Sequence, residues 1–168
     1  MILSGNETTS PANRNTTLDE LDFAILNLMQ QDGRMSFTEL AEKLDASISN
    51  IRSRVTKLLE DKTIQVVGRV NPERVGFHVY ANIKISVRPA NKINEIADQL
   101  LGFGEISFMA ITSGDFDLEI DVMCRDNNHL LELVNSRISC IEGVFQTHTN
   151  MYLKVLKFAQ PDLSSLRP

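Results

Sequence analysis

The sequence lacks the segments that direct a chain into or across a membrane. No apolar run approaches the ~20 residues that a membrane-spanning helix needs. The opening residues 1–4 form too short an apolar stretch, and they lack the charged segment that begins a secretory signal. Cysteine is also scarce, with only Cys124 and Cys140, and without a signal these are most simply reduced thiols. We therefore expect a cytoplasmic protein with no membrane partner.

The residue patterns of common enzyme sites are missing as well. The sequence contains no phosphate-binding loop, no dinucleotide-binding glycine fingerprint and no HExxH motif. His78, His129 and His148 stand far apart, without the spacing of metal ligands and without a nucleophile motif nearby. We expect packing or surface roles for them, and we expect no catalytic residue, no metal and no cofactor.

Charge is unevenly distributed along this acidic chain, whose formal net charge is -5. Residues 1–32 hold one basic residue against five acidic ones, and residues 75–168 hold eight against eleven. Residues 33–74 hold eight basic residues against six acidic ones, a net charge of +2. This mildly basic segment is where a polyanionic partner is expected, although so small an excess is weak evidence by itself.

Residues 17–63 have the apolar periodicity of three helices. Thr17 with Glu20 and Ser36 with Glu39 fit the capping-box pattern, which predicts the starts of the first two helices. A tight break at residues 45–46 precedes the third helix, for which Ser47 is the expected cap. The predicted inner face of this third helix consists of Ile51, Val55, Leu58 and Leu59.

The outer face of the third helix is polar and basic. Two short helices separated by a tight break, after a supporting helix, are typical of a helix-turn-helix. In that arrangement, short polar side chains near the helix start can contact base edges, and arginine or lysine further along can contact phosphates. A basic helix face that is merely solvated is the alternative. The predicted DNA-binding residues are Ser47, Ser49, Asn50, Arg52, Ser53, Arg54 and Lys57.

The periodicity changes to that of strands after residue 63. Predicted strands cover residues 64–70, 79–87, 106–112, 116–124 and 144–158, and predicted helices cover 90–101 and 127–138. From residue 77 this order is β-α-β-β-α-β, a ferredoxin-like unit, so the predicted fold class is α+β. The predicted organisation is a flexible tail 1–16, a helix-turn-helix domain 17–63, a linker strand 64–76, a ferredoxin-like domain 77–158 and a C-terminal tail 159–168.

Acidic residues alternate with apolar ones around the last-but-one predicted strand, where Asp115, Asp117, Glu119 and Asp121 would share one face. A site for a hard metal ion is one interpretation. The favoured interpretation is a polar sheet face whose acids meet Lys84 and Arg88 on a neighbouring strand, or groups across a dimer interface. Alternate residues of a strand lie roughly 6.6 Å apart, too far for neighbouring carboxylates to share one small cation without further ligands.

Five segments make the chain similar to a known family. They are LDELDFAILNLMQQDGRMSFTELAEKL, ISNIRSRVTKLLED, VNPERVG, TSGDFD and GVFQTHTNMYLKVLK, and they lie in this order between Leu18 and Lys157. Together they resemble the Lrp/AsnC family, the leucine- and asparagine-responsive "feast/famine" regulators. Asp45 and Lys62 stand at two positions where that family usually has glycine. A residue with positive φ is expected at Asp45.

The resemblance implies a winged helix-turn-helix followed by a ferredoxin-like effector and oligomerisation domain, often called RAM. It also implies homodimers that commonly assemble into tetramers or octamers. The loop matching TSGDFD lies, in the family, where dimers meet and small amino acids bind. The effector-binding residues it implies are Thr112, Ser113, Gly114, Asp115, Phe116 and Asp117. A plain β-turn is the alternative for this loop.

These observations together predict a non-enzymatic protein that binds double-stranded DNA and regulates transcription. Its assembly or DNA affinity is expected to respond to a small molecule, most simply an amino acid. The alternative is a small-molecule-binding or enzymatic ferredoxin-like protein whose helical part serves only assembly, because fold alone does not exclude catalysis. Measurement of DNA binding separates the two classes.

Overall fold

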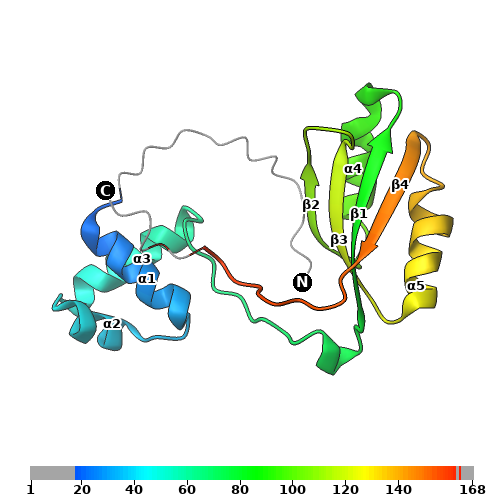
Figure 1. The fold of residues 1–168 in the computed structure, drawn as a ribbon. Coiled ribbons are helices and arrows are strands. Elements are labelled where there is room, and N and C mark those ends of the chain that lie inside the picture. Colours follow the sequence, from blue (N-terminus) through cyan, green and yellow to red (C-terminus); the bar gives the residue numbers. More distant parts are fainter. Residues whose placement is uncertain (1–17, 162, 164–168) are drawn as a thin grey trace. The chain divides into compact units, whose positions relative to one another are not determined.

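The computed structural model of the chain describes residues 18–161 and 163. These residues form two compact units (Figure 1). The sheet unit comprises residues 70–157. The helical unit comprises the described residues up to Arg69 together with those from Phe158 onward. The described residues from Phe158 onward therefore belong with the first helices and not with the strands that precede them.

The helical unit is built from α1 (Glu20–Gln31), α2 (Phe37–Leu44) and α3 (Ile48–Glu60). Their apolar faces meet in a core that includes the fully buried Ile25, Leu40 and Ile51, as the spacing of apolar residues predicts. The capping box of Ser36 and Glu39 is confirmed at the start of α2. Leu59, expected on the inner face of α3, is 42% exposed, because Leu58 occupies the core position next to it.

The start of α1 differs from the expected one. Asp19 is the cap of α1, and it forms a reciprocal capping box with Asp22. The expected pair was Thr17 with Glu20, but Glu20 is already the first residue of the helix, and Thr17 lies outside the described residues. An aspartate caps a helix as well as a threonine does, because its carboxylate accepts the free N–H groups of the first turn.

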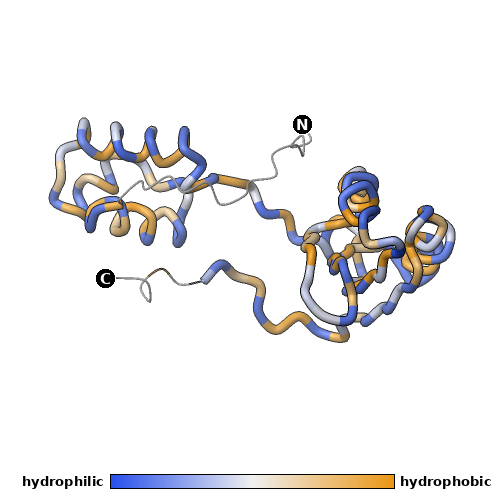
Figure 2. The backbone as a smooth tube through the Cα atoms, turned by 90° about the horizontal axis from the view of Figure 1, so that it is seen from above, coloured by the Kyte–Doolittle hydropathy of each residue, from blue (hydrophilic) through white to orange (hydrophobic). Residues whose placement is uncertain are grey.

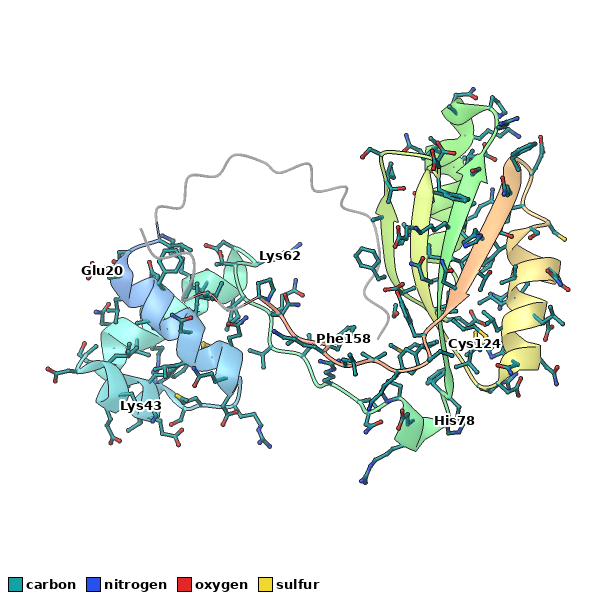
Figure 3. All side chains as sticks on the ribbon, in the orientation of Figure 1. Glu20, Lys43, Lys62, His78, Cys124 and Phe158 are labelled. Atoms are coloured by element: carbon teal, nitrogen blue, oxygen red, sulfur yellow. The ribbon has the colours of Figure 1, made fainter. Side chains whose placement is uncertain are left out.

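Two residues that replace glycines of the resembled family have left-handed backbones. Asp45, between α2 and α3, has φ 48°, as expected. Lys62, just after α3, has φ 62° (Figure 3). Aspartate tolerates this conformation better than most residues, whereas a lysine with positive φ is uncommon. Ser47 caps α3 by accepting the N–H of Asn50, as predicted.

The sheet unit is a four-stranded antiparallel sheet with helices on one face. Its strand order is β2-β3-β1-β4, which confirms the α+β prediction. Short 3-10 turns precede β1 at Glu73–Val75 and α4 at Ala90–Lys92. The other elements are β1 (Val79–Val87), α4 (Ile93–Leu101), β2 (Ile106–Ile111), β3 (Leu118–Cys124), α5 (Asn127–Glu132) with a π-helical continuation Leu133–Ile138, and β4 (Val144–Met151).

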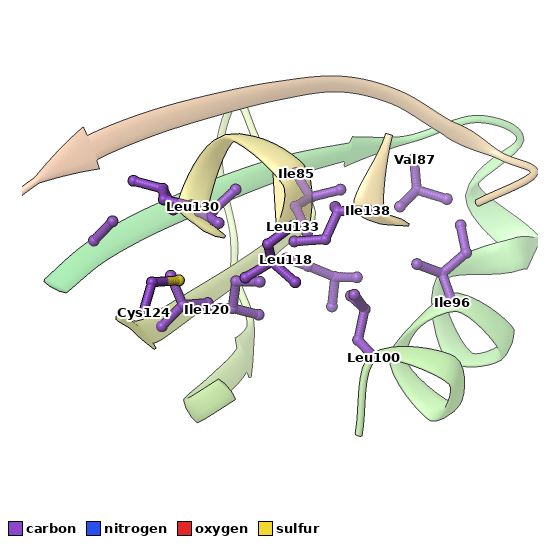
Figure 4. Close-up of a cluster of buried hydrophobic side chains, with 13 residues drawn as sticks. Ile85, Val87, Ile96, Leu100, Leu118, Ile120, Cys124, Leu130, Leu133 and Ile138 are labelled. Atoms are coloured by element: carbon purple, nitrogen blue, oxygen red, sulfur yellow. The ribbon is translucent and has the colours of Figure 1, made fainter. Parts of the chain in front are cut away.

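The core of the sheet unit lies between one face of the sheet and the helices (Figure 4). Alternate residues of the strands, such as Ile83 and Ile120, point into it and are fully buried. Ile96 and Leu100 of α4 and Leu133 of the π-helical turn close it from the other side. Because all the helices of this unit pack on that face, no helix among the described residues of the sheet unit covers the opposite face.

Two predicted strands differ from the structure. Residues 64–70 form no strand, and the strand expected at 144–158 ends at Met151. A strand needs a ladder partner, and β4 loses its partner where β1 begins: Ala81 pairs with Met151, and the last bond joins the Tyr152 N–H to the Tyr80 carbonyl. Both segments still contain hydrophobic residues, which are orange on the backbone tube of Figure 2. Two of them, Val67 and Leu156, are 71% and 84% exposed.

Candidate nucleic-acid and effector interfaces

Helix α3 displays most of the predicted DNA-binding side chains on one exposed face. Its core face is fixed by the burial of Ile51, Val55 and Leu58, and this turns the remaining positions outward. Arg52 lies 5.6 Å from the ring centroid of Phe37 in α2, so its cation has an aromatic neighbour. The exposed members of the predicted set are Ser47, Ser49, Asn50, Arg52, Ser53 and Lys57.

Arg54 stands apart from this set because its side chain is bound within the helical unit. Its Nη1 donates to both carboxylate oxygens of Asp19 at 2.7 Å and to Oδ1 of Asp22 at 2.8 Å. Its Nε donates to Oδ1 of Asn50 at 3.1 Å, one turn earlier on α3. The Arg54 side chain is 28% exposed, against 52% for Asp19 and 16% for Asp22. Arg54 thus joins α3 to the first turn of α1.

This ion-pair cluster shifts the ionisation of its members. The backbone N–H of Asp22 and then the guanidinium of Arg54 hold the pKa of Asp19 below its ordinary value. The same two carboxylates raise the pKa of Arg54. The sequence analysis missed Asp19 and Asp22, although an Asp-x-x-Asp pattern at a helix start is a signal that could have identified them.

The predicted effector loop connects β2 to β3 and is fixed at both ends. Thr112 donates its N–H to the Asp117 carbonyl at 2.9 Å and its Oγ1 to the Phe116 carbonyl at 2.7 Å. Asp117 donates its N–H to the Ile85 carbonyl, and its Oδ2 accepts the Val87 N–H at 2.7 Å. The β1–β4 ladder shifts register at this same Val87, so the carboxylate satisfies a donor beside an irregularity.

The tip of this loop is open. Ser113, Gly114 and Asp115 are exposed, and their backbone N–H groups have no acceptor among the described residues. Gly114 has φ +130°, and a Cβ built there would meet no atom within 4 Å. Ring contact joins Phe116 to His148 of β4, with centroids 6.1 Å apart. The tip therefore presents free donors on a fixed base, which suits the carboxylate of a small ligand.

The open face of the sheet carries acids around one buried amide. Asn82 of β1 is 5% exposed, and its Nδ2 donates to Glu119 Oε1 at 2.9 Å and Asp121 Oδ1 at 3.0 Å. Tyr152 donates its hydroxyl to the same Asp121 oxygen at 3.0 Å. The expected partners of this acid row were Lys84 and Arg88, or groups across a dimer interface. Lys84 stands opposite Glu119 in the β1–β3 register, whereas the Arg88 guanidinium lies 3.8 Å from the Phe145 ring centroid.

The row is also shorter than expected, because β3 begins at Leu118 and leaves Asp115 and Asp117 in the preceding loop. Within residues 18–161 and 163, no group of three or more histidine, cysteine, aspartate or glutamate side chains is placed to hold a metal ion. The same described residues contain no helix long and apolar enough to cross a membrane.

His129 and Cys124 lie in surroundings that indicate a packing role and not a catalytic one. His129 accepts the Arg125 N–H through Nδ1 and meets Glu105 Oε1 through Nε2 at 3.1 Å. Arg137 donates to the same glutamate oxygen at 2.6 Å, which ties the π-helical turn to the start of β2. Burial raises the pKa of the Cys124 thiol to about 11, so at neutral pH it is no nucleophile.

Comparison with known proteins identifies both units. Residues 18–65 match the family model described as a winged helix-turn-helix DNA-binding domain. Residues 79–161 match the model described as the Lrp/AsnC ligand binding domain. An uncharacterised helix-turn-helix transcriptional regulator of Pyrococcus horikoshii is 31% identical over 151 residues, which cover 89% of this chain and 95% of that protein. The regulator LrpA of the same organism is 33% identical over 143 residues, covering 83% and 99%.

Two solved structures have the same fold over nearly their whole length. AsnC of Escherichia coli superimposes with a TM-score of 0.81 at 26% identity, covering 86% of this chain and 97% of that one. A transcriptional regulator of Neisseria meningitidis, solved as a complex with L-Met, gives 0.83 at 26% identity, covering 90% and 100%. The chain belongs to the Lrp/AsnC family of DNA-binding transcriptional regulators, with a winged helix-turn-helix followed by a ligand-binding domain.

Proposed function

We propose that this regulator reads specific DNA sites as a symmetric homodimer, which assembles further into tetramers or octamers, in the cytoplasm. In this proposal an amino acid bound at the loop 112–117 changes its assembly or its affinity for DNA. The observation that carries the DNA-binding part is the exposed polar face of α3, held outward by a buried apolar face on the same helix.

The residues of α3 take different roles in this proposal. Ser49, Asn50 and Ser53 lie near its start, where short polar side chains reach base edges in the major groove. Arg52 and Lys57 are exposed cations that reach phosphates. Arg54 cannot reach DNA without leaving Asp19 and Asp22, so its role is to position α3 and to hold the side chain of Asn50.

Substitutions on α3 should separate base contacts from phosphate contacts. Ser49→Ala should narrow the affinity difference between a selected site and a random duplex by about 1–3 kcal/mol if a good base contact is lost. Lys57→Gln should weaken both complexes equally and should lower the slope of log affinity against log salt by about 1. Gel-shift titrations at several salt concentrations measure both quantities.

Thr56→Ala is the matched control, because Thr56 is exposed on α3 but outside the predicted set. Unchanged affinity and salt slope in all three variants would remove α3 from the DNA interface. Failure of the wild type to bind any duplex would favour the alternative, a ligand-binding protein whose helical unit serves assembly alone.

The open face of the sheet supports the dimer. This face carries the buried Asn82 and the acids it binds, and no helix among the described residues of the sheet unit covers it. The segments on either side of the sheet unit add exposed apolar residues, with Leu153 98% and Val67 71% exposed. A second copy of the chain would cover the sheet face and these apolar residues. Such a dimer is isologous, which means that each partner contributes the same patch. Two copies of α3 would then read two half-sites of one duplex.

The loop tip supports an amino-acid effector. Its free N–H groups suit an α-carboxylate, and the exposed carboxylate of Asp115 suits an α-ammonium. The Neisseria neighbour was solved with L-Met, which is a property of that protein and a reason to begin with amino acids here. Coupling between effector and DNA is reciprocal, so an effector that alters DNA affinity must itself bind more or less tightly when DNA is present.

Calorimetry with each of the twenty amino acids tests the effector site. At least one should bind the wild type, and Asp115→Ala should weaken that binding at least tenfold, because the partner of the ammonium group is lost. Asp98→Ala, an exposed acid on α4, is the control and should bind normally. Substitution of Gly114 is a poorer test, since φ +130° strains any side chain there. Equal binding by Asp115→Ala would place the site elsewhere.

A further inference from the structure

The chain after β4 contacts the helical unit at three points. Arg69 donates Nη1 to the Phe158 carbonyl at 2.9 Å, and its guanidinium lies 4.0 Å from the centroid of the Phe158 ring. Gln30 of α1 donates Nε2 to the Pro161 carbonyl at 2.8 Å. Leu163 is partly buried against the apolar core of the three helices. This short segment is thus anchored by hydrogen bonds to two of its carbonyls, by a ring contact and by one aliphatic side chain.

The two segments that leave the sheet unit start from the same place. β1 and β4 are neighbours in the sheet, and Ala81 at the beginning of β1 pairs with Met151 at the end of β4. The Tyr152 N–H still binds the Tyr80 carbonyl, one pair further on. The chain therefore enters the sheet unit through residues 70–78 and leaves it through residues 152–157 beside its own entry.

Residues 158–161 and 163 belong to the helical unit. We propose that two covalent segments, not one, therefore connect the DNA-binding unit to the ligand-binding unit and restrict its rotation. A single exposed linker lets the joined unit rotate freely, whereas two segments that are anchored side by side at both ends restrict that rotation. A shift of β1 against β4 then reaches the helical unit through both segments. These contacts all lie within one chain, so the double connection does not depend on the identity of the effector.

The anchors should protect the helical unit from local opening. Leu163→Asp places a charge against an apolar core, and a chain ending at Lys157 lacks every anchor. In both variants, hydrogen exchange at the amides of Ile25, Leu26 and Met29 in α1 should be about fivefold to tenfold faster, because partly buried apolar surface is lost. Gln160→Ala, at an exposed residue of the same segment, is the control and should leave exchange unchanged.

Rotation of the helical unit tests the connection itself, without DNA or effector. A dye on Thr56→Cys in a Cys140→Ser background marks α3, while the buried Cys124 stays unlabelled. The fluorescence anisotropy decay of this dye should gain a faster component in the chain ending at Lys157 and in Leu163→Asp. Identical decays in the wild type and both variants would overturn the double connection. Unchanged exchange in α1 would overturn the anchoring of residues 158–163.

Discussion

Replacement of Arg54 by glutamine is expected to destabilise the helical unit by about 1.5–3 kcal/mol, the range for lost hydrogen bonds to charged groups. The substitution leaves Asp22, whose side chain is 16% exposed, without the guanidinium that binds it. It also frees the side chain of Asn50. DNA affinity should fall with stability, but the salt slope should fall by less than it does for Lys57→Gln, because the lost partner is a carboxylate and not a phosphate.

The loss of stability should be larger for substitution of Arg54 than for substitution of the exposed Arg52. Arg52→Gln is the matched control, since it removes the same group from an exposed position on the same helix. It should leave unfolding by urea nearly unchanged and should lower the salt slope by about 1. Arg54→Lys keeps the charge but loses the fork geometry, so it should restore only part of the stability. A stable Arg54→Gln protein with a lowered slope would make Arg54 a phosphate contact.

The Arg54 cluster also gives the helical unit a pH dependence with a definite sign. The pKa of Asp19 is lowered in the folded protein, so its contribution to stability is present above the pKa of the unfolded chain. That contribution is lost as the pH falls through the lowered folded value. In Arg54→Gln one cause of the lowered pKa is gone, and acid unfolding of the helical unit should begin at a higher pH.

Replacement of Asn82 by aspartate should have the largest effect in the sheet unit, about 3–5 kcal/mol at neutral pH, the cost of an unpaired buried charge. Asn82 donates to Glu119 and Asp121, and an aspartate there would add a third carboxylate with no proton to donate. Urea should unfold this variant at a lower concentration than the wild type. Because this face also carries the proposed dimer contact, light scattering should in addition show dissociation of the dimer.

The effect of Asn82→Asp should shrink as the pH falls. Like charges raise the pKa of one carboxyl group of the cluster above its unfolded value. The folded variant is therefore most destabilised above that raised pKa, and it regains stability as protonation restores a donor below it. Asn150→Asp, on the paired strand β4 but exposed, is the control and should cost little at any pH. A loss that is independent of pH would contradict the like-charge explanation.

Much of the fold follows from local patterns in the sequence. Apolar periodicity and caps such as Ser36 and Ser47 fix the helices, because a helix satisfies its backbone within one segment. Strand ends depend on a partner far along the chain, and no local pattern shows that β4 loses its partner after Met151. The boundaries of the domains and the contacts of α3 with DNA stay predictions.

In the candidate DNA interface too, local features can be predicted from the sequence and long-range contacts cannot. Exposure of Ser49 and Lys57 follows from the helical period alone. The binding of Arg54 by Asp19 depends on residues 35 apart in the chain, and the anchoring of Pro161 by Gln30 on residues 131 apart. Such pairs are formed by tertiary packing, so a single sequence can show the aspartates at a helix start but not the distant residue that they bind.

Hydroxyl-radical footprinting on a site selected from random duplexes shows whether two copies of α3 bind one duplex. The full-length protein should protect two segments about 34–36 Å apart, or a multiple of that, on one face of the DNA. Lys57→Gln should weaken both segments together. One protected segment, or protection that does not change in any α3 variant, would contradict DNA binding by two copies of α3.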